Sequence, residues 1–137
     1  MDFNDVPNVA LDFMNRDHKE ATDLINQLLS LISATENGEA KIEEINTLLA
    51  ELFTHNSEHF AREEEQMLKF NFPAYPIHKA AHERVIAEMT TEISSWQRNN
   101  DLPRLKEYVG QTLPDWFIGH IETMDTMTAM FVVRSGG

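Results

Sequence analysis

Two pairs of candidate metal ligands stand four residues apart in this chain. His59 and Glu63 form one pair, and His78 and His82 form the other. Residues at this spacing share one face of a helix, so both side chains of a pair can reach a common centre. Because the chain contains no cysteine, any metal site must be built from nitrogen and oxygen ligands. Either pair alone also fits an ordinary surface or core-satisfied histidine, so the surrounding pattern has to decide.

The first pair lies where a helical repeat reserves positions for apolar side chains. At steps of three and four residues the segment reads Ile45, Leu49, Leu52, Asn56, His59 and Glu63. Buried imidazoles and carboxylates are costly unless a partner compensates them. The pattern therefore predicts either an exposed segment or a partner that lies inside the protein.

Four helical segments must position these residues. They are expected at about residues 9–36, 39–70, 77–98 and 101–133, after an N-terminal arm of about residues 1–8. Glycine, proline and asparagine mark the short breaks between them, and no segment alternates as a strand does. Short breaks favour antiparallel neighbours. The sequence thus predicts a single all-α domain of residues 1–137, an antiparallel up-down-up-down four-helix bundle with an N-terminal arm, in which Pro114 bends the last helix.

Histidine interrupts the apolar stripe of every one of these helices. His18 lies in the first stripe, His78 and His82 open the third, and the fourth is expected to contain Val109, Leu113, Phe117, His120, Met124, Met127 and Phe131. At 1.5 Å per residue, counted from helix ends that meet in an antiparallel bundle, the five histidines fall in one layer. This convergence indicates one shared buried site.

The number of ligands favours two metal ions. Five imidazoles and at least one carboxylate exceed what a single tetrahedral zinc ion uses, and carboxylates are natural bridges between two ions. On the last helix, His120 and Asp125 are five residues apart, about 140° around an ideal helix. Glu122 therefore competes with Asp125 as a ligand, and spacing alone leaves both open.

Four segments occur in an order that is specific as a set: His18, His59-Phe60-Ala61-Arg62-Glu63, His78-Lys79-Ala80-Ala81-His82, and Trp116-Phe117-Ile118-Gly119-His120-Ile121-Glu122-Thr123-Met124-Asp125. Together they resemble the hemerythrin family, including its bacterial single-domain forms, over nearly the whole chain. The resemblance implies a non-haem centre of two Fe ions. In that centre His78, His82 and His120 bind one iron, His18 and His59 bind the other, and Glu63 and Asp125 bridge both with an oxo or hydroxo group. The resemblance also selects Asp125 over Glu122.

The same resemblance implies reversible binding of dioxygen at an open position of the second iron. The chain would then be an oxygen carrier, store or sensor and not an enzyme. Met14, Phe117 and Met124 are expected in the oxygen pocket, since each lies three or four residues from a ligand histidine. Phe117 stands where hemerythrins commonly have a leucine. A carrier is also expected to have an apolar pocket without a nearby acid or base.

Other functions stay open at this point. The open iron could serve an oxidase, a peroxidase or a nitric-oxide-reactive enzyme if a redox partner supplied electrons. Iron storage or donation is a further alternative, and a metal-free structural bundle is the plainest one.

Several neighbouring residues have expected supporting roles. His55, one turn before His59, is expected beside the site or on the surface without binding metal. Glu64 and Glu65 are expected on a solvated face. Ligand histidines normally donate their second N–H to an acceptor, and Asp17, Glu58 and Glu122 are the nearby candidates.

The charge and the hydrophobic pattern of the chain limit the classes of partner that it can bind. The net charge of -12 repels nucleic acid phosphates and anionic membrane surfaces. The longest apolar run near the end, Ala129 to Val133, is far shorter than the ~20 residues of a membrane span, and no export signal is recognisable at the start. We therefore expect a cytoplasmic protein with no nucleic acid or membrane partner. The resemblance implies dioxygen as its partner, and the oligomeric state stays open, with a monomer favoured.

Overall fold

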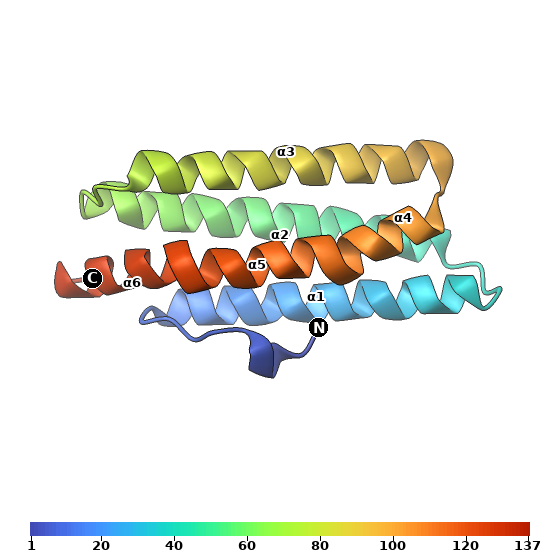
Figure 1. The fold of residues 1–137 in the computed structure, drawn as a ribbon, viewed down its shortest axis with the longest axis horizontal. Helices are drawn as coiled ribbons and strands as arrows, with labels where there is room; N and C mark the ends of the chain where they lie inside the picture. Colours follow the sequence, from blue (N-terminus) through green and yellow to red (C-terminus); the bar gives the residue numbers. More distant parts are fainter.

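The computed structural model describes residues 1–137 as four antiparallel helical rods without strands (Figure 1). The first three rods are α1 (Asp12–Glu36), α2 (Ile42–Lys69) and α3 (Tyr75–Asn99). The fourth rod is composite and consists of α4 (Leu102–Glu107), η2 (Tyr108–Thr112), α5 (Leu113–His120), η3 (Ile121–Asp125) and α6 (Thr126–Arg134). Each rod packs against the two beside it. The predicted all-α four-helix bundle with up-down-up-down topology is confirmed.

The breaks between rods contain the residues that leave the helical conformation most easily. Gly38, Asn71 and Asn100 have positive φ angles of 93°, 57° and 47°, which glycine and asparagine adopt with the least strain. Pro76 and Pro103 lie in the first turns of α3 and α4, where the missing N–H costs nothing. The first three helices therefore end within a few residues of the breaks that the sequence predicted.

The N-terminal arm runs along α1, with one short turn, η1 (Phe3–Asp5). Val6 from this arm is buried in the apolar core. Helix α1 begins at Asp12 and not at about residue 9, because the Asn15 side chain holds Val9 outside the helix. The Asn15 amide accepts from the Val9 N–H and donates to the Val9 carbonyl, both at 2.9 Å.

The apolar core fills the half of the bundle that contains the α1–α2 and α3–α4 connections. The apolar residues expected on the stripe of α1 are all buried: Met14, Ala21, Ile25, Leu28 and Ile32. The expected Val85, Met89 and Trp96 on α3 and Ile45, Leu49 and Leu52 on α2 are buried too, whereas Ile93, also expected on the α3 stripe, is half-buried against the core. Toward the other half, the same stripes continue as buried histidine and carboxylate. Helical periodicity thus predicted the interior of the first three rods.

The fourth rod departs from that periodicity because it contains two π-helical segments. In η2 and η3 a backbone N–H bonds to the carbonyl five residues earlier, from Leu113 to Tyr108 and from Thr126 to Ile121. Segment η2 directly precedes Pro114, whose ring would clash with the carbonyl four residues back in a regular helix. The rod changes direction between α4 and α5 at this place (Figure 1).

Because of segment η3, the buried face of the last rod differs from the apolar stripe that the sequence predicted. Met127 is 63% exposed, whereas Asp125, Thr128 and Val132 are buried. A π turn takes up one residue more than an α turn, so the buried face moves forward by one position. The prediction that Met127 belongs to the core was wrong for this reason.

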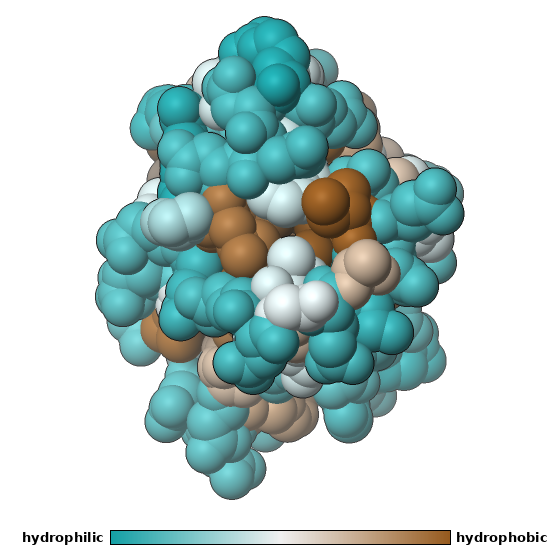
Figure 2. Space-filling model, turned by 90° about the vertical axis from the view of Figure 1, so that its right-hand side faces the viewer, coloured by the Kyte–Doolittle hydropathy of each residue, from teal (hydrophilic) through white to brown (hydrophobic).

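The two ends of the bundle differ in surface character. The end with the α1–α2 and α3–α4 connections is mostly hydrophilic, with small apolar patches (Figure 2). Most of the large apolar side chains that are exposed lie toward the other end: Leu68, Ile77, Met127, Met130 and Val133. No helix combines the length and the apolar character that a membrane crossing needs.

Candidate metal centre

Five imidazoles and two carboxylates meet between the four rods. The histidines point their Nε2 atoms inward: those of His59 and His82 lie 2.7 and 3.1 Å from Glu63, and those of His18, His78 and His120 lie 3.0 to 3.1 Å from Asp125. All seven side chains are buried. Every rod contributes, as the layer calculation from the sequence predicted.

The ligand atoms form two groups that share their carboxylates. One group consists of Glu63, His78, His82, His120 and Asp125, and the other of His18, His59, Glu63 and Asp125. Within each group the ligand atoms lie within 4.8 Å of one another. This arrangement can hold two ions bridged by both carboxylates.

Several of the inward atoms lack a hydrogen-bond partner, which fits a cation at the centre. Five inward polar atoms of the cluster are unpaired: Nε2 of His59 and His82, both oxygens of Glu63, and Oδ1 of Asp125. Unpaired buried polar atoms are costly. The Nε2 atoms of His78 and His120 also face each other at 3.1 Å. Two ligands that bind one ion at ~2.1 Å and at right angles lie ~3 Å apart, so the spacing suits a metal.

The π-helical segment η3 places Asp125 beside His120. Five residues make about one turn of a π helix, so the two side chains share a face and approach to 3.1 Å. Glu122, the competing ligand, is exposed. Spacing could not choose between the two carboxylates because it assumed a regular α-helix. Single π turns are frequent at functional sites.

Outer partners orient three of the histidines. The Nδ1–H of His59 donates to Asp17 at 2.8 Å, and Arg62 donates to the same carboxylate at 2.7 Å. The Nδ1–H of His78 donates to the Thr128 hydroxyl at 2.8 Å. Such contacts fix the tautomer and the ring orientation of a ligand. Asp17 was one of three acceptors suggested by the sequence; Thr128 was missed because the π turn shifts it onto the buried face.

Glu64 is the third of these partners. It accepts from the Nδ1–H of His82 at 2.9 Å and is half-buried. The expectation of a fully solvated face was wrong for Glu64, whereas Glu65 is exposed. Glu58 and Glu122, the other suggested acceptors, are exposed, and neither bonds to a ligand histidine.

The carboxylates of the cluster hold protons on two histidines. Burial lowers the pKa of His59, but the charge of Glu63 and the hydrogen bond to Asp17 outweigh it and raise that pKa to about 10. Burial likewise lowers the pKa of His78, and the nearby carboxylates of Asp125 and Glu63 outweigh it and raise that pKa to about 9. Without metal, the cluster is therefore two imidazolium ions facing two carboxylates.

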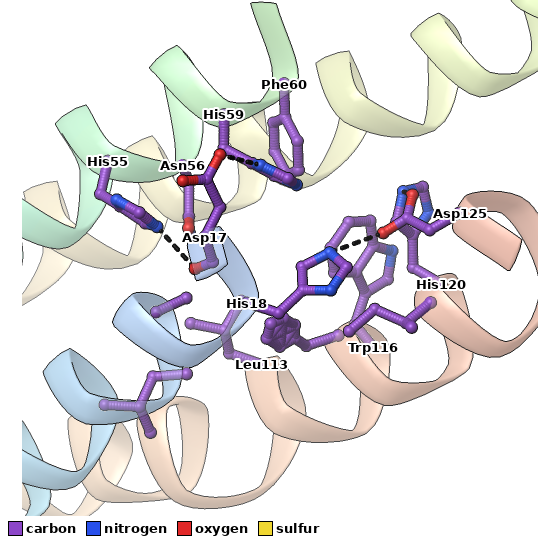
Figure 3. Close-up of a pocket in the computed structure, with 14 residues that line it drawn as sticks. Asp17, His18, His55, Asn56, His59, Phe60, Leu113, Trp116, His120 and Asp125 are labelled. Carbon is purple, nitrogen blue, oxygen red and sulfur yellow. Dashed lines mark hydrogen bonds and ion pairs between the residues drawn. The ribbon is translucent and has the colours of Figure 1, made fainter. Parts of the chain in front are cut away.

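A cavity of about 20 Å³ adjoins the cluster on one side. This exceeds the ~10–15 Å³ that one water molecule needs, so the cavity suits a ligand of one or two heavy atoms. Of the cluster residues, His18, His59, His120 and Asp125 line it, and His78, His82 and Glu63 do not. Apolar walls come from Ile25, Phe60, Leu113, Phe117 and Ile121, and polar ones include His55 and Asn56 (Figure 3).

The three residues expected in the oxygen pocket lie in different places. Phe117 lines the cavity, and its ring centroid lies 5.5 Å from that of His18. Met14 is fully buried but lines no part of the cavity. Met124 lines a separate, mostly apolar groove, which His78 also lines.

Comparison with known proteins adds an independent observation. The family described as "Hemerythrin HHE cation binding domain" matches residues 9–131, which includes all seven cluster residues. The chain belongs to the hemerythrin family. This hemerythrin domain is 29% identical to a "Bacteriohemerythrin" of Aquifex aeolicus (strain VF5) over 126 residues, 92% of each chain. It is also 29% identical to a "Bacteriohemerythrin" of Ralstonia nicotianae (strain ATCC BAA-1114 / GMI1000) over 82 residues, 60% of this chain and 58% of the relative.

Family membership and geometry agree on the nature of this centre. The family is one of cation-binding domains, and the hemerythrin domain described above buries a histidine–carboxylate cluster between its helices. The cluster is thus consistent with a metal site of a hemerythrin HHE domain.

Proposed function

We propose that this domain holds two iron ions and binds dioxygen reversibly at one of them, as an oxygen carrier, store or sensor. His78, His82 and His120 would bind the first ion, and His18 and His59 the second, with Glu63 and Asp125 shared between the two ions. When bound, an iron pair supplies electrons to dioxygen and takes them back when dioxygen leaves. The relatives named bacteriohemerythrin support this assignment.

The position of the cavity is the observation that carries the proposal. Both histidines of the two-histidine group line it, whereas His120 is the one histidine of the other group that does so. The ion with fewer protein ligands would therefore face free space, as a centre that accepts an external ligand requires. A purely structural site would have no such space.

The apolar walls have a role in reversibility. Leu113, Phe117 and Ile121 are buried against the cavity, and they exclude water from a ligand held there. Since protons accompany the irreversible loss of reduced oxygen species, a dry wall favours release of dioxygen unchanged.

One observation favours a second candidate function, the reduction of peroxide or dioxygen with electrons from a redox partner. His55 and Asn56 line the cavity beside His59, although a carrier was expected to have an apolar pocket without a nearby acid or base. The imidazole of His55 is such a group. The cavity therefore combines apolar walls with the polar side chains of His55 and Asn56 on α2.

Metal content and the visible spectrum test the proposal. The anaerobically reduced protein is measured for iron, and spectra are recorded before air, in air and after oxygen removal. Two irons per chain and a charge-transfer band that appears in air and vanishes on deoxygenation are expected. Two irons with irreversible conversion, together with catalytic loss of peroxide, would support the second candidate function.

A ligand variant is the matched control. Replacing His78 and His82 together by leucine removes two imidazoles and should abolish iron binding and the band. A protein that takes up no iron under any reconstitution would contradict the di-iron assignment, and labile iron would point to storage or donation.

A further inference from the structure

His55 lies between the buried cavity and the surface. On its inner side it lines the cavity beside the centre. On its outer side it lines a shallow hollow, open to solvent, on the outer face of α2, with Thr47, Ala50, Glu51, Thr54 and Glu58. His55 is the one residue that lines both spaces. A small molecule in the hollow is thus separated from the cavity by this side chain.

A single hydrogen bond of good geometry holds the ring in this position. The Nε2–H of His55 donates to the main-chain carbonyl of Asp17 on α1 at 2.9 Å (Figure 3). The other ring nitrogen, Nδ1, lies 3.4 Å from the exposed carboxylate of Glu20, also on α1. The ring therefore bridges the seam between α1 and α2, and its side chain is only 12% exposed.

Several of the other walls of the cavity are less able to open. Ile25, Leu113 and Ile121 belong to the packed apolar core, where movement requires displacement of neighbours. Trp116 is half-buried and stacks on the ligand His120, with ring centroids 4.5 Å apart. The outward side of His55, in contrast, faces the open hollow, whose other lining residues all belong to α2. The contact that its Nδ1 makes with α1 is the exposed carboxylate of Glu20 and not a packed apolar residue.

We propose that His55 is the gate through which a small neutral ligand passes between solvent and the cavity of the metal centre. In the closed position the ring is bonded to the Asp17 carbonyl; in the open position it turns into the hollow and connects the hollow with the cavity. The gate deepens the proposed function, on which it rests, because it assigns a residue to the control of ligand exchange. A hydrogen bond of ordinary net strength maintains about a fivefold to tenfold excess of the closed position.

Exchange kinetics test this role in the iron-loaded protein. His55→Ala should raise the association and the dissociation rate constants for dioxygen together, by about fivefold to tenfold, and leave the equilibrium constant within about twofold. Equal acceleration in both directions is the signature of a gate. A change confined to dissociation, or a shift of the equilibrium constant, would instead make His55 a direct contact of the ligand and overturn the proposal.

Fluorescence gives a readout that requires no iron. Trp116 lines the cavity, and Trp96→Phe leaves Trp116 as the single tryptophan. In this background, and in the whole chain without iron, His55→Ala should raise the bimolecular constant for quenching of Trp116 by dissolved dioxygen. This measurement stays informative if the protein proves not to bind dioxygen at its metal centre, so failure of the gate and failure of the proposed function are distinguishable.

Two further variants complete the design. Thr54→Ala removes a side chain of the outer hollow that does not touch the cavity, and it should leave both readouts unchanged. His55→Gln retains an N–H donor for the Asp17 carbonyl and should lie between the parent and His55→Ala; it also serves if the alanine variant folds poorly. If both His55 variants exchange dioxygen and quench at the parental rates while their circular dichroism is native, the route lies elsewhere and the gate is refuted.

Discussion

Asp17 connects α1 to three side chains of α2. Its carboxylate accepts hydrogen bonds from His59 and Arg62, and its carbonyl accepts one from His55. Burial raises the pKa of Asp17, but the bonds from His59 and Arg62 outweigh it and lower that pKa to about 2. One residue thus positions both a ligand and the side chain that separates the cavity from solvent.

Removal of this carboxylate should weaken metal binding without removing a ligand. We expect Asp17→Ala to lower the metal affinity about 10–100-fold, the usual effect of losing an outer partner of a ligand histidine. Competition titration against a chelator of known affinity measures this. Asp23→Ala, at an exposed position of the same helix, is the control; an Asp17 variant that binds metal as tightly as this control would contradict the role.

The two imidazolium ions give the metal-depleted protein a pH dependence. His59 and His78 have pKa values of about 10 and about 9 in the folded protein against about 6.5 when unfolded. Because the folded state then binds more protons, their stabilising contribution is full below pH ~6.5 and is lost as the pH rises through ~9–10. Denaturant unfolding of the stripped protein at several pH values should show this decline, and the metal-loaded protein should show less of it.

At the scale of elements, the fourth rod differs from the other three because it contains two π turns. Segment η3 brings the five-residue spacing of His120 and Asp125 onto one face, and it also moves Thr128 and Val132 to the interior. A π turn is equivalent to one residue inserted into an α-helix. Its effect on the register therefore reaches every later residue of the rod.

Two single-residue deletions separate these effects. Deleting exposed Thr123 within η3 should restore a regular α turn, keep His120 and Asp125 on one face four residues apart, and preserve metal binding. Deleting exposed Met127 one turn later should rotate α6 by ~100°, move Thr128 and Val132 out of the core, and cost more than ~3 kcal/mol. Circular dichroism, unfolding and metal content of the two variants measure this; equal damage from both deletions would count against the argument.

At the scale of the whole molecule, the centre ties the four rods together. Each rod supplies at least one cluster residue, so bound ions would act as cross-links between segments from His18 to Asp125. In their absence, unpaired polar atoms remain in the middle of the bundle. Metal binding should therefore be coupled to stability.

Metal removal tests this coupling. With free metal at about 1,000 times its dissociation constant, the stabilisation is ~4 kcal/mol, which for a domain of this size corresponds to a melting temperature higher by roughly 10–20 °C. Thermal scans with and without a chelator measure the difference. The His78→Leu, His82→Leu double variant should not respond to the chelator, and a parent protein equally indifferent to it would contradict the coupling.

The helical architecture and the convergence of the ligands were determined by the sequence alone. An α-helix has a fixed rise and period, so the spacing of His59 and Glu63, the breaks at Gly38 and Asn71, and the stripes of the first three rods could be read locally. The same rise placed five histidines in one layer before any contact was known. Rules based on the spacing of residues along the chain were sufficient to predict the structure wherever the helix is a regular α-helix.

Only the tertiary structure decided the features that depend on contacts between rods. The π turn that pairs Asp125 with His120, the hydrogen bonds of Thr128 and Glu64 to ligand histidines, and the place of His55 between cavity and hollow all arise where distant segments pack together. A helical period carries no information about such packing, because a one-residue insertion, an acceptor on a neighbouring helix and an empty space are not periodic. These contacts strongly affect the stability of the fold because buried charges are costly unless a partner compensates them.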